Sequence, residues 1–166
     1  VRRIAPGTRI GVRTSLGDRE GDIREINEDT DFFAFTFGSH GLDFAGAVGD
    51  LRAIFAEPKG RKKVAILDLS YPSWEKGGST PQQQAAFVKE VLRLAKENAG
   101  QLEWLSWWSL RDDDVELWKK IGVGLLGKNE SPVMPTFQER CSCGLLHRDG
   151  TQKPALGEWL DGVRAL

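Results

Sequence analysis

Hydrophobic residues follow two alternating patterns along this chain. Four short segments, residues 9–16, 32–37, 64–70 and 102–110, have the apolar patterns of strands. Residues 19–27, 45–56, 80–98 and a final segment from 153 carry apolar positions three or four apart, which predicts helices with one buried face. A unit of strand followed by helix therefore occurs four times.

The segment 64–70 predicts a strand buried on both faces, because five of its residues are apolar and no solvated face remains. Asp68 falls near its C-terminal end. A TIM-barrel enzyme keeps its catalytic acids at such strand ends, so Asp68 is the first candidate catalytic residue. The alternative is a carboxylate that caps the turn at Ser70 and Tyr71 and needs no substrate.

Helix boundaries are marked most clearly at residues 80–83. Thr80 is suited to an N-cap, Pro81 to the first helical position, and Gln83 to the closing residue of a capping box. Pro154 marks the start of the last helix in the same way. Between the fourth strand and that helix, residues 111–152 are predicted to form a long loop insertion with a short helix at 115–121.

A complete barrel of eight strand-helix units takes about 250 residues, and this chain has 166. We therefore expect one α/β domain, residues 1–166, that forms half of a TIM barrel from four parallel strand-helix units. A half barrel exposes two strand edges and an apolar inner sheet face. The expected partner is the missing half barrel or a second copy of the chain. A flavodoxin-type sheet with a phosphate site at 77–80 is a weaker alternative.

Composition narrows the ligand classes. The formal net charge is -1, from 23 basic and 24 acidic residues, so no overall field attracts nucleic acid or an anionic membrane. No apolar run approaches the roughly 20 residues of a membrane span. We expect neither nucleic acid nor a membrane as partner. The chain starts at Val1 and enters a strand almost at once, which is typical of a fragment or a processed product.

Metal and cofactor motifs are weak. Cys141 and Cys143 form a Cys-x-Cys pair without a second pair, so free thiols in a loop are expected, with a metal site that includes His147 as a remote alternative. The acidic run 112–114 lacks the alternating spacing of a calcium loop, so a solvated acidic turn is expected there. We expect no metal and no cofactor.

Several segments together resemble the C-terminal half of the clan of retaining TIM-barrel glycoside hydrolases, which places its acid/base on strand four and its nucleophile on strand seven. The matching segments are residues 4–12 for strand five, 31–37 for strand six, 64–74 for strand seven, 107–112 for strand eight and 144–155 for the loop into the last helix. The resemblance implies a TIM-barrel fold and an extracellular or periplasmic location.

Carried over by position, Asp68 occupies the place of the nucleophile, where the clan has Glu. Phe37 lies near an aromatic hydroxyl that steadies the nucleophile in the clan, and Trp108 matches the tryptophan that floors the sugar subsite. The other residues implied to bind substrate are His40, Tyr71, Trp74 and Arg111. Trp107 and Trp108 are adjacent on a strand and point to opposite faces, so core packing explains at least one of them.

The resemblance implies an oligosaccharide or polysaccharide ligand and hydrolysis of a β-linked glycan by a retaining mechanism, once the missing half supplies the acid/base. The alternative is a non-catalytic carbohydrate-binding or scaffold half barrel. Asp68 is one methylene shorter than Glu, and Phe37 lacks the hydroxyl of Tyr, which motivates that alternative. Whether the chain is an enzyme stays open at this level.

Overall fold

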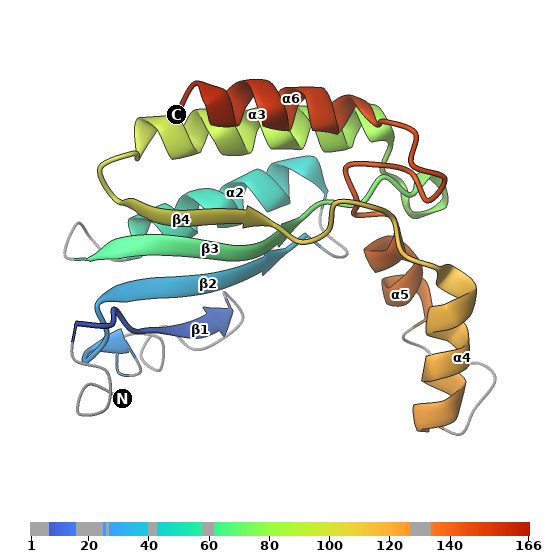
Figure 1. Cartoon of the computed structure of the whole chain (residues 1–166), viewed down its shortest axis with the longest axis horizontal. Coiled ribbons are helices and arrows are strands. Elements are labelled where there is room, and N and C mark those ends of the chain that lie inside the picture. Colours follow the sequence, from blue (N-terminus) through green and yellow to red (C-terminus); the bar gives the residue numbers. More distant parts are fainter. Residues whose placement is uncertain (1–6, 16–24, 26, 40–42, 58–61, 127–133) are drawn as a thin grey trace.

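Four parallel strands form a single sheet in the computed structural model, which describes residues 7–15, 25, 27–39, 43–57, 62–126 and 134–166. The strands are β1 (Gly11–Ser15), β2 (Phe32–Gly38), β3 (Lys63–Ser70) and β4 (Leu102–Trp107). Their order in the sheet is their order in the sequence (Figure 1). This is the arrangement of consecutive strands in a barrel wall, and it confirms the predicted α/β half barrel.

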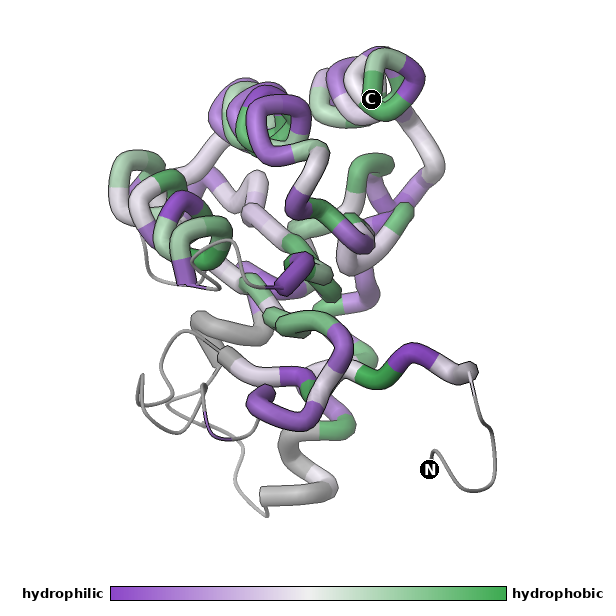
Figure 2. The backbone as a smooth tube through the Cα atoms, turned by 90° about the vertical axis from the view of Figure 1, so that its left-hand side faces the viewer, coloured by the Kyte–Doolittle hydropathy of each residue, from purple (hydrophilic) through white to green (hydrophobic). Residues whose placement is uncertain are grey.

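Three helices cover one face of the sheet. They are α2 (Phe44–Ala56), α3 (Pro81–Glu97) and α6 (Pro154–Arg164), and Figure 2 shows the helices together along one side of the strands. The helix α4 (Val115–Leu126), the helix α5 (Met134–Cys141) and the short 3-10 helix η1 (Glu75–Gly77) follow the strand ends instead. The helix predicted at 19–27 falls mostly outside the described residues.

The core lies between the sheet and its helices. Alternate residues of β2 and β3 point toward α2 and α3, and the buried cluster includes Phe33, Phe35, Phe37, Val64, Ile66, Leu69, Leu51, Ile54, Phe87 and Val91. Each large apolar side chain buried in this way contributes roughly 1.5–3 kcal/mol to folding. A second cluster joins α3 to α6 and includes Leu92 and Ala155. The helices are therefore fixed to one face only.

The capping box at the start of α3 is present as predicted. Thr80 Oγ1 accepts a hydrogen bond from the Gln83 backbone N–H at 3.1 Å, and Gln83 Oε1 accepts one from the Thr80 N–H at 2.8 Å. Both bonds satisfy donors that a helix start would otherwise leave unpaired. The strongest local signal in the sequence thus fixes the first residue of the longest described helix.

No helix among the described residues packs on the opposite face of the sheet, which we call the open face. It carries the residues of β1 and β2 that alternate with the core residues. Where β1 and β2 begin, the ring of Phe32 lies over Gly11, and a Cβ atom at Gly11 would come within 2.3 Å of the ring. Trp104 lies beside Ala65 in the strand register and is 60% exposed. In a closed barrel this face would line the interior.

The described helices include none that is both long and apolar enough to cross a lipid bilayer.

Candidate functional site

Asp68 has an unusual backbone conformation at the C-terminal end of β3. Its φ of +55° lies in the left-handed region, and no other non-glycine residue in the described part of the chain has a positive φ. The register with β4 shifts between Ile66 and Leu69, so Asp68 sits in a local irregularity of the strand. Such a conformation costs about 1–3 kcal/mol and persists where the surrounding structure enforces it, often at functional sites.

The carboxylate of Asp68 faces the open side of the sheet. Its Oδ2 atom lies 3.0 Å from the Arg13 guanidinium of β1, and Arg13 Nε donates a hydrogen bond to Thr36 Oγ1 of β2. Arg13 and Thr36 alternate with the residues that pack on the helices, so all three groups share the open face. Asp68 is 29% exposed, and a pair this accessible to solvent contributes at most about 1 kcal/mol. The ion pair orients the carboxylate more than it stabilises the fold.

The two adjacent tryptophans differ in their surroundings, as predicted. Trp107 packs edge-to-face on Trp159 of α6 at 5.7 Å, and its Nε1 donates to the Cys143 carbonyl at 2.8 Å. Trp108 is 42% exposed, and its backbone N–H donates to the Leu69 carbonyl at 2.8 Å. Because Leu69 follows Asp68 directly, Asp68 and Trp108 belong to neighbouring strand ends.

Phe37 and Tyr71, two of the residues expected to bind substrate, are buried on the helix side of the sheet. Phe37 is 3% exposed and stacks on Phe87 of α3, and Tyr71 is 2% exposed and stacks on the same ring at 4.7 Å. Both rings are therefore in the helix-side core, on the other face from Asp68. Burial raises the pKa of the Tyr71 hydroxyl, and the nearby charge of Asp43 raises it further.

Sequence reasoning missed Arg13 and Thr36 as the neighbours of Asp68. The alternation of β2 carried a usable signal, because Phe37 must share the face of Phe33 and Phe35 while Thr36 takes the opposite one. Arg13 had no such signal. Its contact with Asp68 spans 55 positions in the sequence and depends on how β1 lies beside β2.

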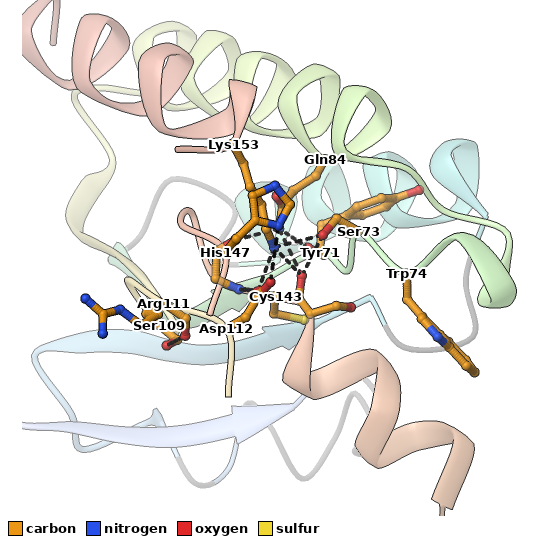
Figure 3. A network of polar contacts seen from close by, with 12 residues as sticks. Tyr71, Ser73, Trp74, Gln84, Ser109, Arg111, Asp112, Cys143, His147 and Lys153 are labelled. Carbon is orange, nitrogen blue, oxygen red and sulfur yellow. Dashed lines mark hydrogen bonds and ion pairs between the residues drawn. The ribbon is translucent and has the colours of Figure 1, made fainter. Parts of the chain in front are cut away.

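The remaining residues predicted to bind substrate do not contact the group formed by Asp68, Arg13 and Thr36. Arg111 is exposed, and Figure 3 shows its side chain pointing away from the polar contacts of Asp112 and Lys153. Trp74 is partly exposed and also points away from those contacts (Figure 3). His40 lies outside the described residues. The structure therefore places Asp68 and Trp108 on neighbouring strand ends, whereas Trp74 and Arg111 lie in the loops that follow.

A buried polar network lies beyond the ends of β3 and β4 (Figure 3). The Nζ atom of Lys153 donates to Asp112 Oδ1 at 2.6 Å, to Ser73 Oγ at 2.8 Å and to the Ser142 carbonyl at 3.1 Å. Asp112 Oδ1 also accepts from the Gly144 N–H at 2.9 Å. All three protons of the ammonium group are used, so Lys153 has no proton or lone pair to offer a substrate. Its role is to join three loops.

Burial shifts the ionisation of this network. It raises the pKa of Asp112 and lowers the pKa of Lys153, and the contact between the two groups opposes both shifts. His147 Nδ1 lies 4.0 Å from Asp112 Oδ2 at the solvent side. The sequence had assigned Asp112 to a solvated acidic turn, and this assignment is wrong because Lys153, 41 positions away, buries and pairs it.

Both cysteines are free thiols, as predicted, and both are buried, Cys141 at the end of α5 and Cys143 in the loop after it. Burial raises the pKa of Cys141 to about 11 and that of Cys143 to about 12. A protonated thiol is a poor metal ligand. In the described part of the chain, no group of three or more His, Cys, Asp or Glu side chains is arranged to hold a metal ion.

No family model and no curated protein matches the sequence. Similar solved structures are xylanases. The native xylanase 10C of Cellvibrio japonicus superimposes with a TM-score of 0.62 at 14% identity, over 99% of this chain and 37% of that one. The native xylanase 10B of Thermotoga maritima superimposes with a TM-score of 0.60 at 15% identity, over 99% of this chain and 49% of that one. Xylanase 10B of Thermotoga petrophila RKU-1 in complex with xylobiose superimposes with a TM-score of 0.60 at 14% identity, over 99% of this chain and 49% of that one.

The chain thus spans half or less of the length of these xylanases. At such low identity the likeness establishes the fold alone, which is that of a partial TIM barrel. It agrees with the four parallel strands, the single helical layer and the open face described above.

Proposed function

We propose that this chain is the half of a glycan-hydrolysing barrel that carries the nucleophile-position carboxylate, Asp68, and a tryptophan platform for sugar, Trp108. The observation that supports this most is the left-handed backbone at Asp68, which aims its carboxylate at the open face next to a strand end. TIM-barrel enzymes carry their catalytic groups at the C-terminal ends of barrel strands, and strained backbone conformations cluster at functional sites.

The ligand class is a β-linked xylan-type oligosaccharide. Structures similar to this chain include xylanases in complex with xylobiose and xylopentaose, which supports a neutral pentose polymer. An exposed indole such as Trp108 offers a flat apolar surface to the C–H face of a sugar ring, and the carboxylate of Asp68 lies on the adjoining strand end.

A retaining mechanism needs a second carboxyl group about 5 Å from the nucleophile. In the described residues, the ion-pair partner of Asp68 is the Arg13 guanidinium. The carboxylate of Glu103 on β4 pairs instead with Arg9 and with Lys63, and Lys63 lies at the start of β3, at the opposite end of the strand from Asp68. We therefore assign the general acid to another half barrel. Asp68 would attack the anomeric carbon to form a glycosyl ester while that acid protonates the leaving oxygen, and water would then cleave the ester.

The partner that completes the barrel is either the missing N-terminal half or a second copy of this chain. Two features support a partner: the open face has no described helix on it, and Trp104 on that face is 60% exposed. The outer edges of β1 and β4 also lack a neighbouring strand in the described sheet. Light scattering of the chain tests this, because a stable monomer with an intact thermal transition would exclude the second copy.

A non-catalytic glycan-binding half barrel is the second candidate. The ion pair between Arg13 and Asp68 favours it, because a carboxylate held by a guanidinium at 3.0 Å is a weaker nucleophile than a free one. The shorter Asp side chain adds to this, since a displacement of about 1 Å can lower a rate on the order of a hundredfold.

Hydrolysis of aryl β-xylosides and of xylan, measured on the full-length protein that carries this chain, decides between these candidates. The wild type is compared with Asp68→Asn and Asp68→Glu, and binding of xylotetraose is measured in parallel. Loss of turnover in Asp68→Asn with retained binding supports the hydrolase. Binding without turnover in every variant supports the second candidate, and absence of both turnover and binding would overturn both.

A further inference from the structure

A groove lies next to the buried network, in a different place from Asp68. Its volume is about 680 Å³, which is in the range of small-molecule sites. Four segments line it: the loop with Ser73 and Trp74, the residues from Asp112 into the first turn of α4, the last turn of α5, and the turn at 147–148. Neither Asp68 nor Trp108 is among the lining residues.

The walls of the groove are joined by hydrogen bonds between segments that are distant in sequence. The Ser73 N–H and Oγ both donate to the Ser142 carbonyl, at 3.1 and 3.0 Å, and the Asp113 N–H donates to the Cys141 carbonyl at 3.0 Å. The ammonium group of Lys153 joins the same segments through its hydrogen bonds to Ser73, Asp112 and Ser142. A groove held in this way exists before a ligand arrives, so binding costs little ordering of the protein.

Three lining side chains are available to a ligand. Trp74, Asp113 and Gln138 make no side-chain hydrogen bond to other described residues, and Figure 3 shows the indole of Trp74 turned away from the buried network. An indole face takes the C–H side of a sugar ring, a carboxylate accepts from hydroxyl groups, and an amide both donates and accepts. This combination fits a polyhydroxylated ligand.

The charges of the groove favour a neutral ligand over an anionic one. Arg148 is paired with Asp114, and the buried Lys153 with Asp112. The carboxylates of Glu75 and Asp113 have no cationic partner among the described residues, whereas Lys76 is the one lining lysine or arginine without a carboxylate partner there. A phosphate, sulfate or uronate would meet net negative charge.

We infer that this groove is a second glycan site, in which a neutral β-linked oligosaccharide stacks on Trp74 and bonds through its hydroxyls to Asp113 and Gln138. The inference rests on the proposed function for the class of ligand, but it uses none of the residues of the Asp68 site. A second site of this kind would hold a polysaccharide strand beside the strand ends.

Indole N–H resonances of the whole chain in a ¹⁵N–¹H NMR titration with xylotetraose test this inference, because each tryptophan gives its own signal. Variants Trp74→Phe, Trp108→Phe and Trp104→Phe assign the signals and keep an aromatic ring in place. We expect the Trp74 signal to move with added xylotetraose, and Asp113→Ala to raise the xylotetraose concentration needed for this movement about tenfold. Trp104→Ala is the matched exposed control and should leave it unchanged.

The outcomes separate the two proposals. Movement of the Trp74 signal without movement of the Trp108 signal supports the groove and counts against the Asp68 site. Movement of the Trp108 signal alone overturns the groove. A static spectrum up to millimolar xylotetraose overturns both, and stronger binding of a sulfated tetrasaccharide at Trp74 would overturn the neutral ligand class.

Discussion

The Nζ atom of Lys153 and the Oδ1 atom of Asp112 lie 2.6 Å apart, and the lysine side chain has no exposed surface. The pair joins the loop after β4 to the start of α6, and its hydrogen bonds to Ser73 and Ser142 add the loop after β3 and the segment after α5. Both the groove and the position of α6 depend on this contact. A charge that is buried with a partner becomes costly when the partner is removed.

Lys153→Met should lower the free energy of unfolding by about 3 kcal/mol, because it leaves the Asp112 carboxylate buried without its cation. Urea unfolding followed by tryptophan fluorescence measures the change. The double variant Lys153→Met with Asp112→Leu should recover most of the loss, since an apolar pair replaces the ionic one. Lys119→Met, which removes an exposed pair with Glu116, is the control and should change stability by less than about 0.5 kcal/mol. Equal losses for Lys153 and Lys119 would contradict a buried pair.

Stability should fall at alkaline pH because of the buried thiols. The pKa of Cys143 is raised to about 12 and that of Cys141 to about 11, from an ordinary value of 9.0. Above pH 9 the unfolded chain loses these protons while the folded chain keeps them, so the stabilisation is complete below pH 9 and is lost as the pH rises toward 11 and 12. Each thiol contributes a slope of up to about 1.4 kcal/mol per pH unit.

The measurement compares urea unfolding of the wild type with Cys141→Ser/Cys143→Ala between pH 8 and 11. Other groups titrate in this range in both proteins, so the difference between the two slopes reports the thiols. A difference near zero would show that the thiols ionise in the folded chain. Reaction with a thiol reagent at pH 8 should be slow in the native protein and fast in urea.

Asp68 is held in a left-handed conformation, which a glycine adopts without strain. We expect Asp68→Gly to be more stable to urea than Asp68→Ala by about 1 kcal/mol, because both variants lose the ion pair with Arg13 and only alanine keeps the strain. Asp68→Asn should fall between them. If the alanine and glycine variants unfold at the same urea concentration, the strain assigned to this position is absent.

Phe37→Tyr distinguishes the family resemblance from the structure. The resemblance implies that a hydroxyl at this position would steady the nucleophile. The structure places the ring against Phe87 in the core, where an added hydroxyl would be removed from water, so the variant should lose about 1–3 kcal/mol of stability and gain no activity. Phe32→Tyr, on the open face, should be close to neutral. Improved turnover in Phe37→Tyr would contradict the position of the ring.

Local sequence patterns predicted most of the architecture. The strand-helix repeat predicted four parallel strands, the capping residues Thr80 and Gln83 fixed the start of α3, and the apolar segment 64–70 placed Asp68 at a strand end. These features depend on interactions within a few residues or on the burial of a whole face, which a periodic pattern records directly. The helix α5 was not predicted, because its segment has no apolar stripe of useful length.

The partners of the charged groups were decided by tertiary structure alone. Arg13 reaches Asp68 only because β1, β2 and β3 lie in that order, and Lys153 reaches Asp112 only because α6 begins next to the loop after β4. Local sequence around each of these residues is compatible with a solvated surface. Pairing of a charge depends on which distant group shares its low-dielectric site, and the sequence records that distance only after the chain has folded.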